Sequence, residues 1–275
     1  MGKTLYLECY SGISGDMTVA ALLDLGADRL VLDRVLKSLK VSGFETKISR
    51  VVKSGIDACD FDVVLDKEHE NHDHDMEYLH GHHHEGHESN HAHGTGTAQD
   101  HHHHEHRGIK EITYIIEHSA MTENAKKIAL RIFEILAEAE SKAHNVPVDQ
   151  VHFHEVGMLD AVADVTGVCL LLHQLRPLRV TATPVAVGSG SVRCAHGVLP
   201  VPAPATAFLL EGLPTASGPS SGELCTPTGA ALLRHFVQAF GPVPAEGGRV
   251  GRGMGARRFP GHCNAVTARL VPSPG

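Results

Sequence analysis

The sequence contains no tryptophan, and aromatic residues make up only 4% of its 275 positions. Any core must therefore be built from aliphatic side chains, which are plentiful because hydrophobic residues account for 42% of the chain. No apolar run approaches the roughly 18 residues that a membrane-spanning helix needs, and no signal peptide precedes the first apolar segment. The length is that of one large domain or two small ones. These features predict a globular, cytoplasmic protein with no membrane partner.

The chain also lacks paired cysteines and a basic surface. None of its six cysteines forms a C-x-x-C pair, which argues against a disulfide framework and against a four-cysteine zinc site, so reduced thiols are expected. The net charge of −8 is local, because residues 66–106 hold ten acidic residues and one lysine, which leaves a net charge of +1 for the rest. A nucleic-acid-binding protein would need a basic surface, so that class of partner is not supported.

Hydrophobic periodicity predicts an α/β or α+β fold, in which a mixed sheet packs against helices. A strand at 3–8 leads through a Gly/Ser loop at 12–16 to a helix that Asp16 caps and Gly26 ends. A helix at 28–40 and a hairpin with strands at 44–49 and 59–65 follow. Further helices are expected at 108–119, 122–144, 160–174, 202–211 and 226–240, and further strands at 178–188 and 263–271. Thr122 and Thr226 are the predicted N-caps of the helices at 122–144 and 226–240.

Residues 67–107 form a His/Asp/Glu/Gly segment that holds 15 of the 23 histidines and almost no aliphatic side chains. Such a composition cannot bury enough apolar surface to offset the entropy of ordering, so we expect a disordered insertion between body segments at 1–66 and 108–275. Neutral imidazole binds nickel, copper and zinc. The alternative is a solvated linker, but this density of histidine favours metal binding. The clustered candidate ligands are His82, His83, His84, His101, His102, His103 and His104.

A second candidate site is the stretch HFHEVGMLDAVAD at 152–164. On an extended backbone His152 and His154 point the same way, with Glu155 beside them. Asp160 and Asp164 are four residues apart on the following helix and share one face near its N-terminus. Two imidazoles and up to three carboxylates are the residues of a metal or acid/base site. The plainer alternative is a polar strand followed by an acidic helix start.

Three Gly/Ser/Pro loops lead into helices and are candidates for anion binding. In YSGISGD at 10–16 the candidates are Ser14 and Gly15, but the loop lacks the Gly-Lys-Ser/Thr of a P-loop. Asp16 would repel a phosphate group unless a divalent ion, bound by Glu8 and Asp16, bridged to that phosphate. The loop at 188–206 offers Arg193 and His196, and GELCTPTG at 222–229 offers Thr226 and Thr228. Ordinary loop and capping roles remain the alternative for all of them.

Taken together, four stretches and the intervening histidine-rich segment resemble the LarC family of nickel insertion proteins. The stretches are YLECYSGISGDM at 6–17, VHFHEVGMLDAVADV at 151–165, HGVLPVPAPATAFLLEG at 196–212 and GELCTPTGAAL at 222–232. The resemblance spans nearly the whole chain, and its motifs are long and occur in order. Two features depart from the family pattern. Glu8 stands where Asp is expected, and the chain stops at VPSPG, before the C-terminal domain that the family associates with CTP.

The resemblance implies a lyase of the nickel chelatase type. It would insert Ni²⁺ into pyridinium-3,5-bisthiocarboxylic acid mononucleotide, with CTP and Mg²⁺ or Mn²⁺, to make the nickel-pincer cofactor of lactate racemase-like enzymes. The resemblance also implies a need for the family's C-terminal domain, supplied separately or in a fused form. In this hypothesis His152, His154 and Glu155 hold nickel, and Asp16, Asp160 or Asp164 accepts a proton. A nickel store without chemistry and a zinc hydrolase remain as alternatives, and a homo-oligomer stays open.

Overall fold

The computed structural model describes residues 2–65, 108–151, 153, 159–194, 197–244, 247–259 and 261–272. The expected disorder of residues 67–107 lies outside these ranges. Residues on both sides of that segment contribute strands to the same main sheet. Within the described ranges, no helix is both long enough and apolar enough to span a bilayer.

The helices follow the predicted order, although their ends differ by a few residues. They are α1 (Gly15–Asp24), α2 (Arg29–Ser38), α3 (Ile109–Glu117), α4 (Glu123–His144), α5 (Leu159–Leu175), α6 (Pro204–Leu210) and α7 (Pro227–Phe236), with a 3-10 turn at Val148–Gln150. Side-chain caps begin three of them, as the sequence predicts for α4 and α7. The Asp28 carboxylate accepts from Leu30, the Thr122 hydroxyl from Ala125 and the Thr226 hydroxyl from Gly229.

The main sheet has seven strands in the order β11-β4-β1-β13-β12-β3-β2. It is mixed: β4 runs parallel to β1 and β11, while β13 lies antiparallel between β1 and β12. The strands are β1 (Lys3–Glu8), β2 (Phe44–Lys53), β3 (Ile56–Leu65), β4 (Arg179–Ala182), β11 (Ala239–Phe240), β12 (Arg249–Met254) and β13 (Ala265–Pro272). Short pairs complete the described strands: β5 (Val185–Ala186) with β9 (Thr215–Ala216), β6 (Gly188–Ser189) with β10 (Gly222–Glu223), and β7 (Ser191–Cys194) with β8 (Gly197–Pro200).

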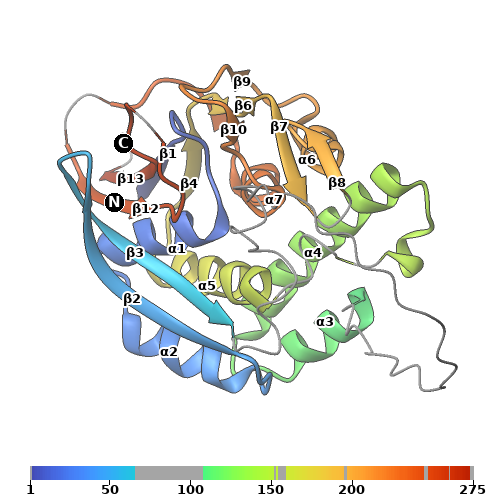
Figure 1. The fold of residues 1–275 in the computed structure, drawn as a ribbon. Helices are drawn as coiled ribbons and strands as arrows, with labels where there is room; N and C mark the ends of the chain where they lie inside the picture. The colour runs from blue at the N-terminus through green and yellow to red at the C-terminus, as the bar shows by residue number, and fades with distance from the viewer. Residues whose placement is uncertain are drawn as a thin grey trace, which may run out of the picture.

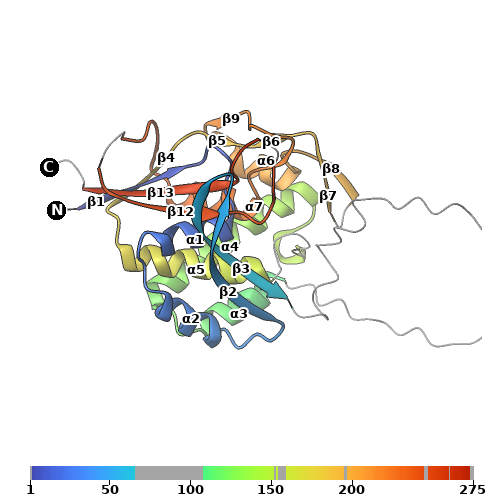
Figure 2. The ribbon, with the colours of Figure 1, turned by 60° about the vertical axis from the view of Figure 1, so that its left-hand side comes forward.

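The longer helices are stacked on one face of the sheet (Figure 1). Figure 2 shows α1 directly against the sheet, α5 beneath α1, and α2 and α3 farther away. Every residue of α5 from Ala161 to Leu172 is buried. A helix that is buried on all sides belongs to the interior of the core, so polar groups on α5 need partners there.

Close packing of α1 on β12 depends on two glycines. A β-carbon at Gly253 would overlap the carbonyl oxygen of Met17, and one at Gly251 would overlap that of Ala21. Glycine in a strand interior often marks such a close approach of another backbone. The sequence predicts no strand at 249–254, because glycines and arginines give this stretch no apolar alternation.

Four sequence predictions need correction. Ser14, not Asp16, is the N-cap of α1, and Asp16 lies in its first turn. The helix predicted to reach residue 240 ends at Phe236, and Ala239–Phe240 form β11 beside β4. The strand predicted at 178–188 is divided into β4, β5 and β6, since Pro184 cannot donate to a ladder. The loop predicted at 188–206 contains the hairpin of β7 and β8.

Candidate functional site

The N-terminal ends of α1 and α5 meet in the interior of the protein. A β-carbon at Gly15 would overlap the carboxylate of Asp164, so only glycine allows the two helices to come this close. The backbone N–H of Asp16 donates a hydrogen bond to the same carboxylate. The i,i+4 pair predicted on α5 is therefore joined by Asp16 from α1. We call Asp16, Asp160 and Asp164 the carboxylate cluster.

Burial and mutual repulsion alter the acidity of this cluster. Burial raises the pKa of Asp164 well above its ordinary value, and the charges of Asp16 and Asp160 raise it further. The pKa of Asp16 is also raised, first by burial and then by Asp160 and Asp60, while hydrogen bonds from the Ser14 hydroxyl and the Met17 N–H oppose the shift. Like charges and low polarity both disfavour ionised carboxylates. The cluster is therefore suited to holding a proton or a cation.

One oxygen in the cluster has no hydrogen-bond partner among the residues that the structure describes. Asp164 is 8% exposed, and its Oδ1 is buried without a partner among the described residues. A buried carboxylate oxygen without a partner is costly, because the lost hydration is not replaced. Protonation of Asp164, or a bound group that donates to Oδ1 or carries positive charge, would remove that cost.

The described residues do not by themselves complete a metal centre. They contain no group of three His, Cys, Asp or Glu side chains arranged to hold a metal ion. The predicted ligands His152, His154 and Glu155, and the seven candidate histidines at 82–84 and 101–104, lie outside the described residues. Their neighbours Val151 and Phe153 are buried, and the Phe153 ring meets Phe133 of α4 edge to face, with the ring centroids 6.4 Å apart.

Two of the predicted anion loops are in direct contact. The Ile13 N–H donates to the Leu224 carbonyl (3.0 Å), and the Ile13 carbonyl accepts from Thr226 (3.1 Å). Gly229 in the first turn of α7 permits this contact, since a β-carbon there would overlap the Ile13 carbonyl. The loop containing Ser14 and Gly15 thus lies beside the start of α7, where Thr226 caps the helix and Thr228 is buried.

Other predicted side chains do not lie in the cluster. Arg193 is on the exposed hairpin of β7 and β8, and His196 is outside the described residues. Glu8, considered as a metal ligand with Asp16, instead pairs with Arg269 of β13 at 3.4 Å. Asp60 of β3 was not predicted, yet its charge acts on Asp16. Asp60 occupies a polar position in an alternating strand, as solvent-facing carboxylates commonly do. The sequence therefore gives no sign that Asp60 lies near Asp16.

Buried cysteines lie beside the loops, and their thiols are protonated in the metal-free protein. The five cysteines that the structure describes in full are free thiols. Burial raises the pKa of Cys9 to about 12. The pKa of Cys225 is also raised, mainly by burial and secondly by the nearby Cys9. Both thiols therefore stay protonated at neutral pH, whereas the thiolate is the metal-binding form.

Comparison with known proteins gives one consistent result. The family model described as nickel insertion protein matches residues 5–273. This chain belongs to the nickel insertion protein family. The pyridinium-3,5-bisthiocarboxylic acid mononucleotide nickel insertion protein of Alkaliphilus metalliredigens is 44% identical over 98% of this chain and 61% of its own length. The proteins of that name from Geobacillus kaustophilus and Staphylococcus epidermidis are 39% and 35% identical, over 96% and 94% of this chain and 58% and 57% of their own lengths.

The chain thus spans about three fifths of the length of these curated relatives. No solved structure matches it. The geometry of the carboxylate cluster therefore comes from this structure alone, and the relatives contribute family membership.

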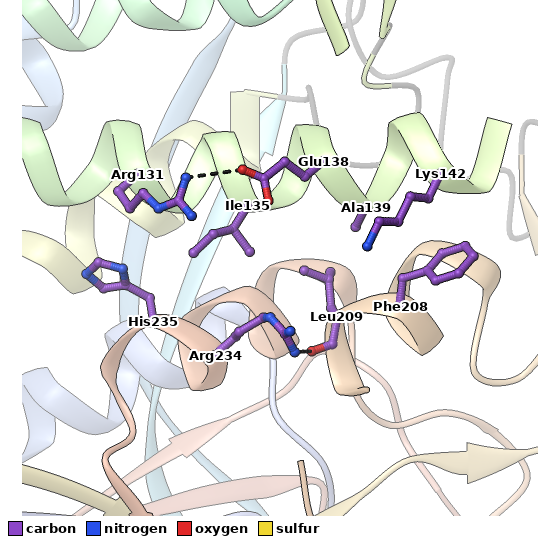
Figure 3. Close-up of a pocket in the computed structure, with 9 residues that line it drawn as sticks. All are labelled: Arg131, Ile135, Glu138, Ala139, Lys142, Phe208, Leu209, Arg234 and His235. Carbon is purple, nitrogen blue, oxygen red and sulfur yellow. Dashed lines mark hydrogen bonds and ion pairs between the residues drawn. The ribbon is translucent and has the colours of Figure 1, made fainter. Parts of the chain in front are cut away.

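In this nickel insertion family member, the larger of two notable pockets lies away from the carboxylate cluster, between α4 and the α6–α7 pair (Figure 3). Its volume is about 410 Å³. Its arginines already have partners, since Arg131 pairs with Glu134 and Glu138 and Arg234 donates to the Leu209 carbonyl at 3.0 Å. The Lys142 ammonium lies over the Phe208 ring, 5.8 Å from its centroid. The contacts of Arg131 lie within α4, and that of Arg234 joins α7 to α6, so this pocket does not replace the carboxylate cluster as the candidate site.

Proposed function

We propose that this chain is the part of a nickel chelatase that inserts Ni²⁺ into pyridinium-3,5-bisthiocarboxylic acid mononucleotide. Support comes from relatives of that name, which match this chain over 94–98% of its length. The structural observation that carries the proposal is the buried Asp164 carboxylate. Its pKa is raised by burial, Asp16 and Asp160, and its Oδ1 has no partner within the described part of the chain. A metallation that releases a proton needs such an acceptor.

The chemical step balances without a redox change. The electron pair of one pyridinium ring C–H bond becomes the nickel–carbon bond, and the proton passes to a carboxylate of the cluster. The two thiocarboxylate sulfurs bind the same nickel ion, as soft ligands that select nickel over magnesium. Asp164 is the preferred acceptor, because burial and the charges of Asp16 and Asp160 raise its pKa well above the ordinary value. Asp16 and Asp160 keep that acidity low.

Nickel is the cargo of this reaction, and we propose that His152, His154 and Glu155 present it. Glu155 precedes the first residue of α5 by four positions, so the covalent chain limits the separation of their Cα atoms to about 14 Å. The histidines of residues 67–107 would gather the ion first. Many interchangeable imidazoles raise the local nickel concentration without fixing one geometry.

The substrate is a nucleotide, and the loops at the starts of α1 and α7 are proposed to contact it. Ser14, Gly15, Thr226 and Thr228 lie there, while Arg193 and His196 would act from the hairpin of β7 and β8. The start of α1 lacks the P-loop lysine that would hold a triphosphate, and CTP there would depend on its Mg²⁺ or Mn²⁺ to offset the charge of Asp16. We therefore assign the CTP requirement to the portion of the longer relatives outside the matched region. We also propose a cytoplasmic location, where free thiols stay reduced.

The test is a nickel insertion assay by mass spectrometry. The purified chain would be incubated with substrate, Ni²⁺, CTP and Mg²⁺ or Mn²⁺, with and without the C-terminal part of the Alkaliphilus metalliredigens relative. We expect the nickel adduct with the added part, and a loss of roughly 100-fold or more in rate for Asp164→Asn. Asp149→Asn, at an exposed position on the 3-10 turn, is the matched control. Binding of nickel without any adduct under all conditions would instead favour a nickel store.

A further inference from the structure

A second, smaller pocket lies where the turn of the β2–β3 hairpin meets the connection between β12 and β13. Its volume is about 280 Å³. The two sides are fixed to each other, because the Lys53 ammonium donates to the Gly255 carbonyl at 2.7 Å and the Asn264 amide donates to the Arg257 carbonyl at 3.2 Å. We call it the basic pocket, lined by Lys53, Arg257, Arg258, Phe259, His262 and Asn264 together with the residues at the hairpin turn.

The charge of the basic pocket is positive and only partly neutralised. Three of its lining side chains are cationic and none is a carboxylate. Arg257 is held by Glu223, through its carbonyl at 3.1 Å and its carboxylate at 3.8 Å. Arg258 makes no ion pair with any residue that the structure describes, and Lys53 has a third N–H beyond the two carbonyls of 255 and 256. Among the described residues, Arg258 therefore lacks an ion-pair partner, and Lys53 keeps one N–H available for a ligand.

An aromatic wall completes the basic pocket. The rings of Phe259 and His262 are stacked, with centroids 5.0 Å apart and planes 15° from parallel. The Nδ1 atom of His262 is 3.0 Å from the Ser220 hydroxyl, whereas its Nε2 is buried without a hydrogen-bond partner among the described residues. Flat apolar surface beside unpaired cations suits a ligand with both a ring and an anionic group.

The basic pocket adjoins the carboxylate cluster. A β-carbon at Gly255 would lie 2.9 Å from the sulfur of Met17, which follows Asp16 in α1. Asp60 of β3 is paired in register with Met254 of β12. The charge of Asp60 raises the pKa of Asp16, and the charge of Lys53 in turn opposes the rise in the pKa of Asp60. One ligand can therefore place an anionic end among the cations and its other end toward the carboxylates.

We propose that the basic pocket binds the phosphate-bearing end of a pyridinium mononucleotide, with the phosphate on Arg258 and Lys53 and the ribose against Phe259. This inference rests on the proposed function and adds the residues that select the substrate class. The pocket volume of about 280 Å³ is just below the range of about 300–1,000 Å³ for whole-ligand pockets, so it suits one end of a mononucleotide. Guanidinium and phosphate match in geometry as well as in charge.

The test is direct binding of nicotinic acid mononucleotide to the full chain by calorimetry, without nickel. This probe has the pyridinium ring and the ribose 5′-phosphate but no thiocarboxylates. We expect Arg258→Ala to weaken binding roughly 10- to 100-fold and Phe259→Leu to weaken it several-fold. Arg34→Ala, at an exposed arginine on α2, should bind as the parent does. Unchanged thermal melting would show that each variant is folded.

Three further ligands distinguish the sources of a phosphate signal. Nicotinic acid riboside, which lacks the phosphate, should bind at least tenfold more weakly, and inorganic phosphate should compete only weakly. CTP binding as tightly as the mononucleotide, with the same loss in Arg258→Ala, would overturn the assignment of substrate class. Unchanged mononucleotide affinity in folded Arg258→Ala would overturn the site itself.

The same variants separate this inference from the proposed function. If nickel insertion proceeds and Arg258→Ala leaves the KM for the bisthiocarboxylic substrate unchanged, the basic pocket is not the phosphate site, and the chelatase proposal stands. If the mononucleotide binds through Arg258 but no nickel adduct forms under any condition, the pocket stands and the chelatase proposal fails.

Discussion

The backbone N–H of Asp16 donates a hydrogen bond to the carboxylate of Asp164, across the meeting point of α1 and α5. This contact joins residues that are 148 positions apart in the sequence, and it leaves the Oδ1 atom of Asp164 without a partner among the described residues. The arrangement stabilises a protonated or cation-bound carboxyl group rather than a bare anion.

Replacing Asp164 with Asn should make the protein more stable at high pH. The folded-state pKa of Asp164 is raised, so its contribution to stability is complete below the ordinary Asp pKa of about 3.9 and is lost as pH rises through the raised value. The amide of Asn stays neutral, and the variant should gain on the order of 1–3 kcal/mol relative to the parent at pH 8 but little at pH 4. Thermal or urea unfolding at both pH values measures this. An Asp164→Asn protein with the same pH dependence as its parent would contradict the raised pKa.

Substituting Gly253 by Ala should destabilise the protein, because the new methyl group would overlap the Met17 carbonyl and force α1 away from β12. Overpacking of this kind costs about 1–3 kcal/mol. Gly241→Ala is the matched control, since a β-carbon there meets nothing within 4 Å. Denaturant midpoints of the two variants should differ clearly. Equal midpoints would show that α1 and β12 are less closely packed than the structure has them.

Loss of the Thr226 hydroxyl should weaken the start of α7. Its oxygen accepts a hydrogen bond from the Gly229 N–H at 3.2 Å, and removal of such a cap costs about 0.5–2 kcal/mol. Thr226→Ala should therefore unfold at lower denaturant concentration, while Thr226→Ser should restore most of the loss. If both variants instead match the parent in stability but raise the KM for the nucleotide, Thr226 acts chiefly on the ligand.

Deleting residues 67–107 and joining the ends by a short Gly/Ser linker should raise the nickel concentration needed for half-maximal insertion by several-fold. The rate at saturating nickel should be nearly unchanged, because the proposed chemistry depends on the cluster and on residues 152–155. Insertion rates over a nickel titration, with nickel binding measured by equilibrium dialysis, test this. Loss of nearly all function at every nickel concentration would favour a store over a chelatase.

Local patterns determined the order and kind of most elements. The alternation of the hairpin strands, the 3.6-residue periodicity of α2 to α4 and the caps Thr122 and Thr226 depend on neighbours within a few positions, and the structure confirms them. Strand β12 escaped prediction, because its glycines carry no apolar signal and are explained only by the helix that packs on them.

The sequence by itself also showed the density of histidine at 67–107, the pairing of Asp160 with Asp164 on one helix face, and the family motifs. Only the tertiary structure decided that Asp16 joins that pair, that Glu8 turns instead to Arg269, and that Lys53 and Arg258 share one pocket. The reason is physical. Helix periodicity acts over one or two turns, whereas the acidity of a buried carboxylate and the charge of a pocket depend on residues that only the folded sheet and its helices bring together.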